Sequence, residues 1–476
     1  MTEIAHLKRL SELKSNTGIR FLTPAAQPGN HCPLHTATRF AGEVAGLSTL
    51  LVGTPECCTY ADIAAHRPEG SGTSHRSYVL DANDVVFGCR DGLIAAIAEM
   101  DKAGARAILV AVTCVPELVG EDVGAILREA KGNVGAKLAY VMLGNFKCVD
   151  ASAGSWKSFE AMVSFMEPKA KRPYVINILG GSDGQSQLPS VLEKRGFCLR
   201  FIGQGASLGK YETATDAALN IVAASSTIQM AERMKKEFGT PFVDMCGLYA
   251  PEDLRGAYAE IGEILGVELQ GEFDGKQAIL LQEGMRERFG EKTFILTGMR
   301  GETGLPIAAY LTELGMIPLL VDLPDFTVQD KKWAERITQR GVDPPVCHMI
   351  NGEADSKILA GFAPDLLLGM QARGGRGGGR PMDSGRGGRP MDGGRGDRSI
   401  ADRQGGGRPM NGGRGGGRSM GDGRGGGGRP MGGNGRHGGR DGGHHEQDRQ
   451  QQGDPFPRHF HHRDLLHSSY LLFFGS

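Results

Sequence analysis

Short apolar runs alternate with amphipathic helical segments over the first 370 residues, and this alternation limits the possible fold more than any other feature. Each run has four to six mostly apolar, partly β-branched residues, which is typical of a strand buried on both faces of a parallel sheet. Helical patterns are predicted at residues 91–103, 216–238 and 305–314. The chain is therefore predicted to be an α/β protein with doubly wound parallel sheets, whose ligands bind at the carboxyl ends of strands. The predicted strands are residues 107–112, 138–143, 174–179, 293–297, 317–322 and 365–368.

Two breaks in the pattern, near residues 168–173 and 271–276, divide this part of the chain. We expect an N-terminal domain over residues 1–170, a second domain over 171–273 and a third, incomplete domain over 274–370. Gly239 is predicted to end the helix of the second domain, because glycine adopts a left-handed cap and Pro241 cannot continue a helix.

The composition changes abruptly at residue 371. Residues 371–476 hold 34 of the 74 Gly of the chain and carry 18 Arg against 10 Asp and Glu. This segment has too few large apolar residues to offset the entropy of ordering it, so we expect a disordered, low-complexity tail. Its Arg-Gly-Gly repeats are typical of segments that contact phosphates and stack on bases, which makes nucleic acid a candidate partner. The tail begins inside a predicted domain, so a shifted reading frame or a recombined gene end is the alternative to a native extension.

No apolar run approaches the roughly 20 residues that span a bilayer. The first 20 residues also lack the pattern of a secretory signal. We therefore expect a cytoplasmic protein without a membrane partner. The number of cysteines is odd, so we expect them to be core residues or metal ligands rather than to form disulfides. The nine cysteines are at positions 32, 57, 58, 89, 114, 148, 198, 246 and 347.

Cys114 directly follows the predicted strand at 107–112, while Cys32 lies in His-Cys-Pro-Leu-His and Cys57 and Cys58 lie in Pro-Glu-Cys-Cys-Thr. Three such loop thiols can hold three corners of an iron-sulfur cluster, with the missing ligand supplied by a partner subunit. Zinc is disfavoured because spacings of 25 and 57 residues are too open for a zinc knuckle. Simple packing is expected for the other thiols, which are Cys89, Cys148, Cys198, Cys246 and Cys347.

The most specific motif of the chain is Thr113-Cys114 followed by Glu-Leu-Val-Gly-Glu-Asp at 117–122. Further motifs are Cys32, Gly53-Thr-Pro-Glu-Cys57 with Thr59-Tyr60, Val86-Phe87-Gly88, Gly239-Thr-Pro241, and the segments at 311–316 and 363–369. Through these motifs the chain resembles, over about residues 20–370, the nitrogenase component 1 superfamily, which includes nitrogenase molybdenum-iron protein subunits, their cofactor-assembly homologues and nitrogenase-like reductases.

The resemblance implies three Rossmann-like domains in a subunit that pairs with a homologous subunit, in a homo- or hetero-oligomer, with an iron-sulfur cluster held between them. Cys32, Cys57 and Cys114 match the cluster ligands of the family, and Cys58 is the alternative to Cys57. The resemblance also implies an ATP-dependent iron protein as the electron donor, docking over this cluster. The chain itself has no Gly-x-x-x-x-Gly-Lys-Ser/Thr loop, in agreement with nucleotide hydrolysis on a separate protein.

Two departures from the family concern its second, active-site metallocluster. The stretch that carries an anchoring cysteine in the catalytic subunit reads Val222-Ala-Ala-Ser-Ser226 here, and the region of the anchoring histidine is replaced by the tail. The leading hypothesis is a nitrogenase-like oxidoreductase subunit that passes electrons through the shared cluster, with no catalytic residue, substrate or second metallocluster assigned. The alternatives are a scaffold for metallocluster assembly and a nucleic-acid-binding protein that acts through its tail.

Overall fold

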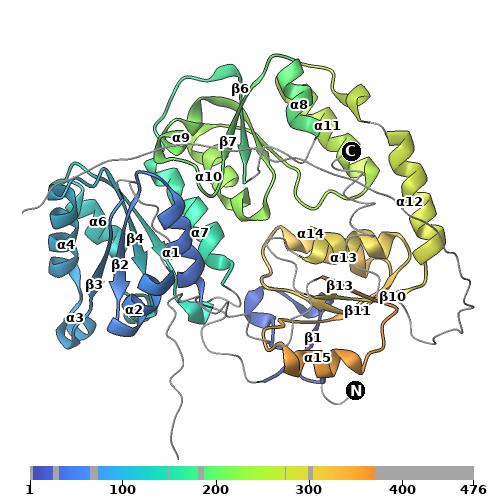
Figure 1. Ribbon diagram of the computed structural model, residues 1–476, viewed down its shortest axis with the longest axis horizontal. Helices are drawn as coiled ribbons and strands as arrows, with labels where there is room; N and C mark the ends of the chain where they lie inside the picture. The colour runs from blue at the N-terminus through green and yellow to red at the C-terminus, as the bar shows by residue number, and fades with distance from the viewer. Residues whose placement is uncertain are drawn as a thin grey trace, which may run out of the picture. The chain divides into compact units, whose positions relative to one another are not determined.

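The structure is a computed structural model that describes residues 4–24, 32–64, 73–147, 151–180, 187–273, 275–297 and 304–369. Three mostly parallel sheets with helices against them make up this part of the chain (Figure 1). The α/β, Rossmann-like class expected from the sequence is confirmed. The expected disorder of the tail concerns residues 371–476, which lie outside the described part. Within the described part, no helix is long and apolar enough to cross a membrane.

The first sheet has the order β3-β2-β4-β5 and is parallel throughout. All six residues of both β2 and β4 are buried. Alternate side chains of these strands enter two different cores, so that Leu51 and Leu109 point to one face and Leu50 and Val110 to the other. The strands are β2 (Ser48–Gly53), β3 (His75–Val79), β4 (Ala107–Val112) and β5 (Lys137–Met142), and the helices are α1 (Pro33–Glu43), α2 (Pro55–Ala64), α3 (Ala82–Phe87), α4 (Arg90–Lys102), α5 (Cys114–Val119), α6 (Val123–Ala130) and α7 (Ala153–Met162).

The second sheet has the order β7-β6-β8-β9 and is also parallel. It shares one apolar core with the first sheet, since Leu179 and Val222 lie in the same cluster of buried side chains as Leu51 and Leu109. The strands are β6 (Arg172–Leu179), β7 (Cys198–Ile202), β8 (Ala217–Val222) and β9 (Phe242–Asp244), and the helices are α8 (Gln187–Lys194), α9 (Leu208–Glu212), α10 (Ile228–Phe238) and α11 (Pro251–Leu265).

The prediction of one continuous helix over residues 216–238 is wrong. Ala217–Val222 forms β8, a short 3-10 turn follows at Ser225–Thr227, and only Ile228–Phe238 is the helix α10. The first part reads Ala-Ala-Leu-Asn-Ile-Val, which a helix tolerates, but pairing on both sides with β6 and β9 makes it a central strand. The predicted end of the helix is confirmed, because Gly239 caps α10 in the left-handed conformation at φ 66°.

The third sheet has the order β1-β12-β11-β10-β13, and β1 alone is antiparallel. The chain start lies on this sheet, because Lys8 pairs with Val346 and Leu22 donates to the carbonyl of His348 at 3.0 Å. Residues expected in the first domain thus cover an edge of the third sheet, and the boundaries near 170 and 273 stay predictions. The elements are β1 (Lys8–Arg9), β10 (Thr293–Thr297), β11 (Ile317–Asp322), β12 (Pro345–Cys347) and β13 (Leu366–Gly369), with α12 (Gly275–Phe289), α13 (Gly304–Glu313), α14 (Asp330–Thr338) and α15 (Glu353–Ala360).

Candidate functional site

The carboxyl ends of β2 and β4 form the candidate site. β2 is the first strand of its sheet along the chain, and β3 and β4 lie on opposite sides of it, so the direction of winding reverses between β2 and β4. Ligands of open α/β sheets bind in the crevice at such a reversal. Cys57 follows β2 in α2, and Cys114 follows β4 as the first residue of α5. Two of the predicted ligands therefore flank the point at which sheets of this topology bind their ligands.

The two strand ends are packed against each other through Gly53 and Thr113. A Cβ atom added to Gly53 would lie 2.5 Å from the Oγ1 atom and 2.8 Å from the Cγ2 atom of Thr113. The backbone N–H of Thr113 donates to the carbonyl of Val52 at 3.0 Å. Position 53 has to be glycine because the threonine side chain occupies the space of a side chain there. This close approach brings the turns before Cys57 and Cys114 side by side.

The Cys114 thiol is half-buried and sits beside Asn145. Its Sγ atom lies 3.1 Å from Asn145 Oδ1, and the backbone N–H of Asn145 donates to the same sulfur at 3.3 Å. These two contacts hold the Cys114 sulfur against the segment that follows β5. Asn145 has no signal in the sequence pattern, because it reaches Cys114 only through the neighbouring strand β5.

Cys57 and Cys58 are adjacent on α2 but differ in exposure. Cys57 is half-buried, whereas Cys58 is buried with a relative exposure of 8%. The Cys58 thiol donates to the carbonyl of Gly53 at 3.7 Å, and burial raises its pKa. A buried thiol with a raised pKa is a poorer metal ligand than an accessible one. The geometry therefore favours Cys57 over Cys58, although the choice stays a prediction.

Cys32 precedes α1 and is followed by Pro33 at the first helical position, which fixes where the helix begins. The thiol is half-buried and, like Cys57 and Tyr60, packs against the core between the first and second sheets. Burial raises the pKa of Tyr60, and a smaller contribution in the same direction comes from the nearby Cys32. His35 packs against Tyr60, with ring centroids 5.5 Å apart.

The segment at 117–122 shapes the turn after Cys114 through its polar side chains. Glu117 accepts from the backbone N–H of Gly144 at 2.8 Å, and Glu121 accepts from that of Cys89 at 2.9 Å. Gly120 ends α5 in the left-handed conformation at φ 81°, and Asp122 caps α6. These residues therefore fix the loops around the candidate site rather than supply its chemistry.

Large apolar side chains are exposed at the same end of the first sheet. Phe87 is 83% exposed and Val86 71% exposed at the end of α3, while Leu118 is 64% exposed on α5. Helices α3 and α5 contact each other, and Phe146 follows β5 nearby in the chain with 46% exposure. We call Val86, Phe87, Leu118, Val119 and Phe146 the apolar edge. Exposed apolar groups gathered in one region mark a surface that another protein covers.

The three predicted ligands are thiols, which is the donor type that iron-sulfur clusters take. Within the described residues, no three His, Cys, Asp or Glu side chains gather closely enough to hold one ion. In an iron-sulfur cluster each thiolate binds a different iron, so its ligands stand apart. Beside these thiols the Oγ1 atom of Thr113 is buried and has no hydrogen-bond partner in the described part of the chain, so it could donate to a bound group.

The other cysteines divide into packed and exposed thiols. Burial, followed by the nearby Glu121 carboxylate, raises the pKa of Cys89 to about 12, and Cys347 is fully buried. The expectation that Cys198 is packed is wrong, because it is the exposed first residue of the edge strand β7. Cys246 is half-buried and donates to the carbonyl of Val222 at 3.7 Å. Cys148 and His31 lie outside the described residues.

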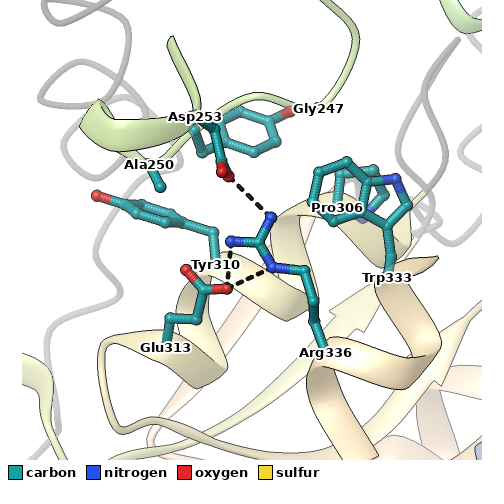
Figure 2. A pocket seen from close by; sticks show the side chains of 9 residues that line it. Gly247, Ala250, Asp253, Pro306, Tyr310, Glu313, Trp333 and Arg336 are labelled. Atoms are coloured by element: carbon teal, nitrogen blue, oxygen red, sulfur yellow. Dashed lines mark hydrogen bonds and ion pairs between the residues drawn. The ribbon is translucent and has the colours of Figure 1, made fainter. Parts of the chain in front are cut away.

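A small cavity lies between α11 and the helices α13 and α14 (Figure 2). It has no room for a water molecule, whereas ligand pockets begin at roughly 300 Å³. The Arg336 side chain occupies it, with Nη1 2.8 Å from Oδ2 of Asp253 and Nη2 2.7 Å from Oε1 of Glu313. The guanidinium also lies over the Trp333 ring at 5.2 Å. This cavity is a packed junction between the second and third sheets, not a binding site.

A family model described as nitrogenase component 1 type oxidoreductase matches residues 32–375. The chain belongs to this family. All three predicted thiol ligands lie within the matched region. Members of this family bind iron-sulfur clusters and metalloclusters. The ligands in this chain stay a proposal.

Several relatives carry the name nitrogenase iron-molybdenum cofactor biosynthesis protein NifE. The one from Methanococcus maripaludis is 28% identical over 44% of this chain and 46% of its own length, so the chain spans about half of it. The one from Clostridium pasteurianum is 27% identical over 67% of this chain and 73% of its own length. A nitrogenase molybdenum-iron protein alpha chain from Methanosarcina barkeri is 28% identical over 49% of this chain and 47% of its own length.

Among solved structures, the one titled nitrogenase Cp1 at pH 6.5 is similar to 72% of this chain and 82% of its own, with a TM-score of 0.54 and 16% identity. At this identity the likeness supports the fold alone.

Proposed function

We propose that this chain is a scaffold subunit for the assembly of a nitrogenase-type metallocluster. In this proposal Cys32, Cys57 and Cys114 hold an iron-sulfur cluster shared with a homologous partner subunit. The observation that carries the proposal is the contrast between two strand ends. Thiols flank the reversal point of the first sheet, whereas β8 ends in Val222-Ala-Ala, whose side chains cannot bind a metal. The Cys246 thiol beside them donates to the Val222 carbonyl at 3.7 Å. Several relatives named as cofactor biosynthesis proteins support the scaffold role over catalysis.

The residues at the carboxyl ends of β2 and β4 have different roles in this proposal. Soft thiolates suit iron-sulfur chemistry, and the accessible Cys57 serves better than the buried Cys58. Asn145 steers the Cys114 sulfur through its backbone N–H. The bound cluster would supply one-electron transfer.

The apolar edge supplies a surface for partners beside the thiols. Phe87 and Leu118 stand more than half exposed next to the turn that carries Cys114. We assign this end of the first sheet to contacts with the homologous subunit and with an ATP-dependent iron protein that delivers electrons. A protein partner that covers these side chains removes a large apolar area from water, which drives association.

The scaffold role is tested by loading and transfer. The chain is prepared anaerobically with its homologous partner, supplied with a metallocluster precursor, and mixed with a nitrogenase that lacks its active-site cofactor. A scaffold restores activity to that nitrogenase and has no reductase activity of its own with the iron protein. Steady substrate reduction by the complex without transfer would overturn the scaffold role and favour the second candidate.

The second candidate is an oxidoreductase subunit that relays electrons from the iron protein to a substrate site in its complex. The family description and the same thiol arrangement favour it.

A role in nucleic-acid binding rests on residues 371–476 alone. Removing these residues would abolish a salt-sensitive RNA affinity and leave the cluster intact if the tail has that role.

A further inference from the structure

The Thr113 side chain is buried at 2% relative exposure, and its hydroxyl has no hydrogen-bond partner in the described part of the chain. Buried hydroxyls without a partner are uncommon in folded proteins, and each one calls for a physical reason. Thr113 stands immediately before Cys114 and against the end of β2, between the turns that lead to two of the proposed cluster ligands.

The Thr113 hydroxyl does not form the hydrogen bond that a threonine usually forms at the start of a helix. Thr113 is the residue before α5, where a hydroxyl commonly caps the first turn of the helix, yet its side chain makes no capping hydrogen bond. Nearby carbonyls already have donors, since Gly53 accepts from Leu80 at 2.9 Å and Val52 accepts from the Thr113 backbone at 3.0 Å. The hydroxyl is therefore turned away from the helix toward the neighbouring strand end.

Packing alone does not explain the hydroxyl. The Cγ2 methyl and Oγ1 of Thr113 together fill the space beside Gly53. Valine has nearly the same shape and would fill this space without burying an unpaired polar atom. A bound group that accepts a hydrogen bond from this hydroxyl would explain why position 113 is threonine.

We propose that the Thr113 hydroxyl donates a hydrogen bond to a sulfur atom of the iron-sulfur cluster and thereby sets its reduction potential. This inference rests on the proposed cluster at Cys32, Cys57 and Cys114. Thiolate and sulfide sulfurs accept hydrogen bonds, and these bonds are one of the ways in which a protein tunes a cluster. The reduced cluster carries more negative charge on sulfur, so the bond stabilises the reduced form and raises the potential.

Thr113→Val and Thr113→Ser separate the hydroxyl from the shape of the side chain. We expect Thr113→Val to keep the wild-type iron content while the potential, followed by EPR in a redox titration of the complex, shifts to more negative values. Thr113→Ser keeps the hydroxyl and stays close to wild type. As a matched control, Thr312→Val removes a buried hydroxyl in α13 that donates to the carbonyl of Ala308 at 2.7 Å, and it leaves the potential unchanged.

A second measurement compares the stability in urea of the proteins without their cluster. Because valine removes an unpaired hydroxyl, cluster-free Thr113→Val is expected to be at least as stable in urea as cluster-free wild type. An unchanged potential in Thr113→Val, or an equal shift in Thr113→Ser, would overturn the inference while leaving the cluster proposal intact. A wild-type complex without iron and sulfide would overturn both.

Discussion

Replacing Gly53 with alanine tests the packing that brings the two cysteine turns together. The new methyl would lie 2.5 Å from Oγ1, 2.8 Å from Cγ2 and 3.2 Å from Cβ of Thr113. Carbon and oxygen atoms do not approach below about 3 Å without displacement, so one strand end has to move. The ends of β2 and β4 are buried and joined by the 3.0 Å bond between Thr113 and Val52. Overpacking of this kind costs about 1–3 kcal/mol of unfolding free energy.

The assay is urea unfolding followed by circular dichroism on the cluster-free protein, so that lost metal does not contribute. Gly256→Ala is the matched control, because nothing lies within 4 Å of a Cβ at this helical position. Alanine in a helix interior should stabilise the control variant by roughly 0.5–1 kcal/mol. The two variants are therefore expected to move in opposite directions.

A double-mutant cycle assigns the cost to the named contact. Thr113→Ala removes the Oγ1 and Cγ2 atoms that meet the new methyl, so Gly53→Ala should cost at least about 1 kcal/mol less in that background. Additive effects of the two substitutions would refute the reasoning, since they would mean that Thr113 is not what excludes a side chain at position 53.

The remaining predictions concern the junction and a buried thiol. Arg336→Ala leaves the carboxylates of Asp253 and Glu313 facing each other without a cation. Because these groups are half-buried, we expect the free energy of unfolding in urea to fall by about 1–2 kcal/mol. Arg336→Lys does not recover this loss, because a lysine cannot bridge both carboxylates. The Cys89 pKa of about 12 lies above the roughly 8.5 of an unfolded thiol, so the folded state holds this proton more tightly and wild-type stability falls as the pH rises above about 8.5. Cys89→Ser should lose stability less steeply between pH 8.5 and 10.5, and equal slopes would contradict the assignment.

The buried strands were largely readable from the sequence. β4, β10 and β11 begin and end where the apolar runs predict, because strands buried on both faces need a continuous apolar run. β8 was missed because its alanines and leucine also suit a helix, and only pairing with β6 and β9 decides its conformation. The two-residue β1 carries no pattern of its own, and its pairing with β12 joins segments more than 330 residues apart.

The candidate site was only partly readable. A cysteine at the end of an apolar run identifies Cys114 as a candidate ligand, but the adjacent Cys57 and Cys58 are distinguished only by the rotation of α2, which buries one of them. The Thr113 hydroxyl, which is unpaired among the described residues, and the contact between Asn145 and Cys114 both depend on how neighbouring strands end. Such relations arise from tertiary packing and leave no local pattern in the chain.

The most direct test of the central claim is the iron and sulfide content and the EPR spectrum of the anaerobically prepared complex, compared among single cysteine variants. We expect a cluster in wild type, in Cys58→Ala and in the control Cys198→Ala, whose thiol is exposed on β7 away from the site. We expect Cys114→Ala to lose or alter the cluster, as should Cys32→Ala and Cys57→Ala. A wild-type complex without a cluster, or an unchanged cluster in Cys114→Ala, would contradict the account.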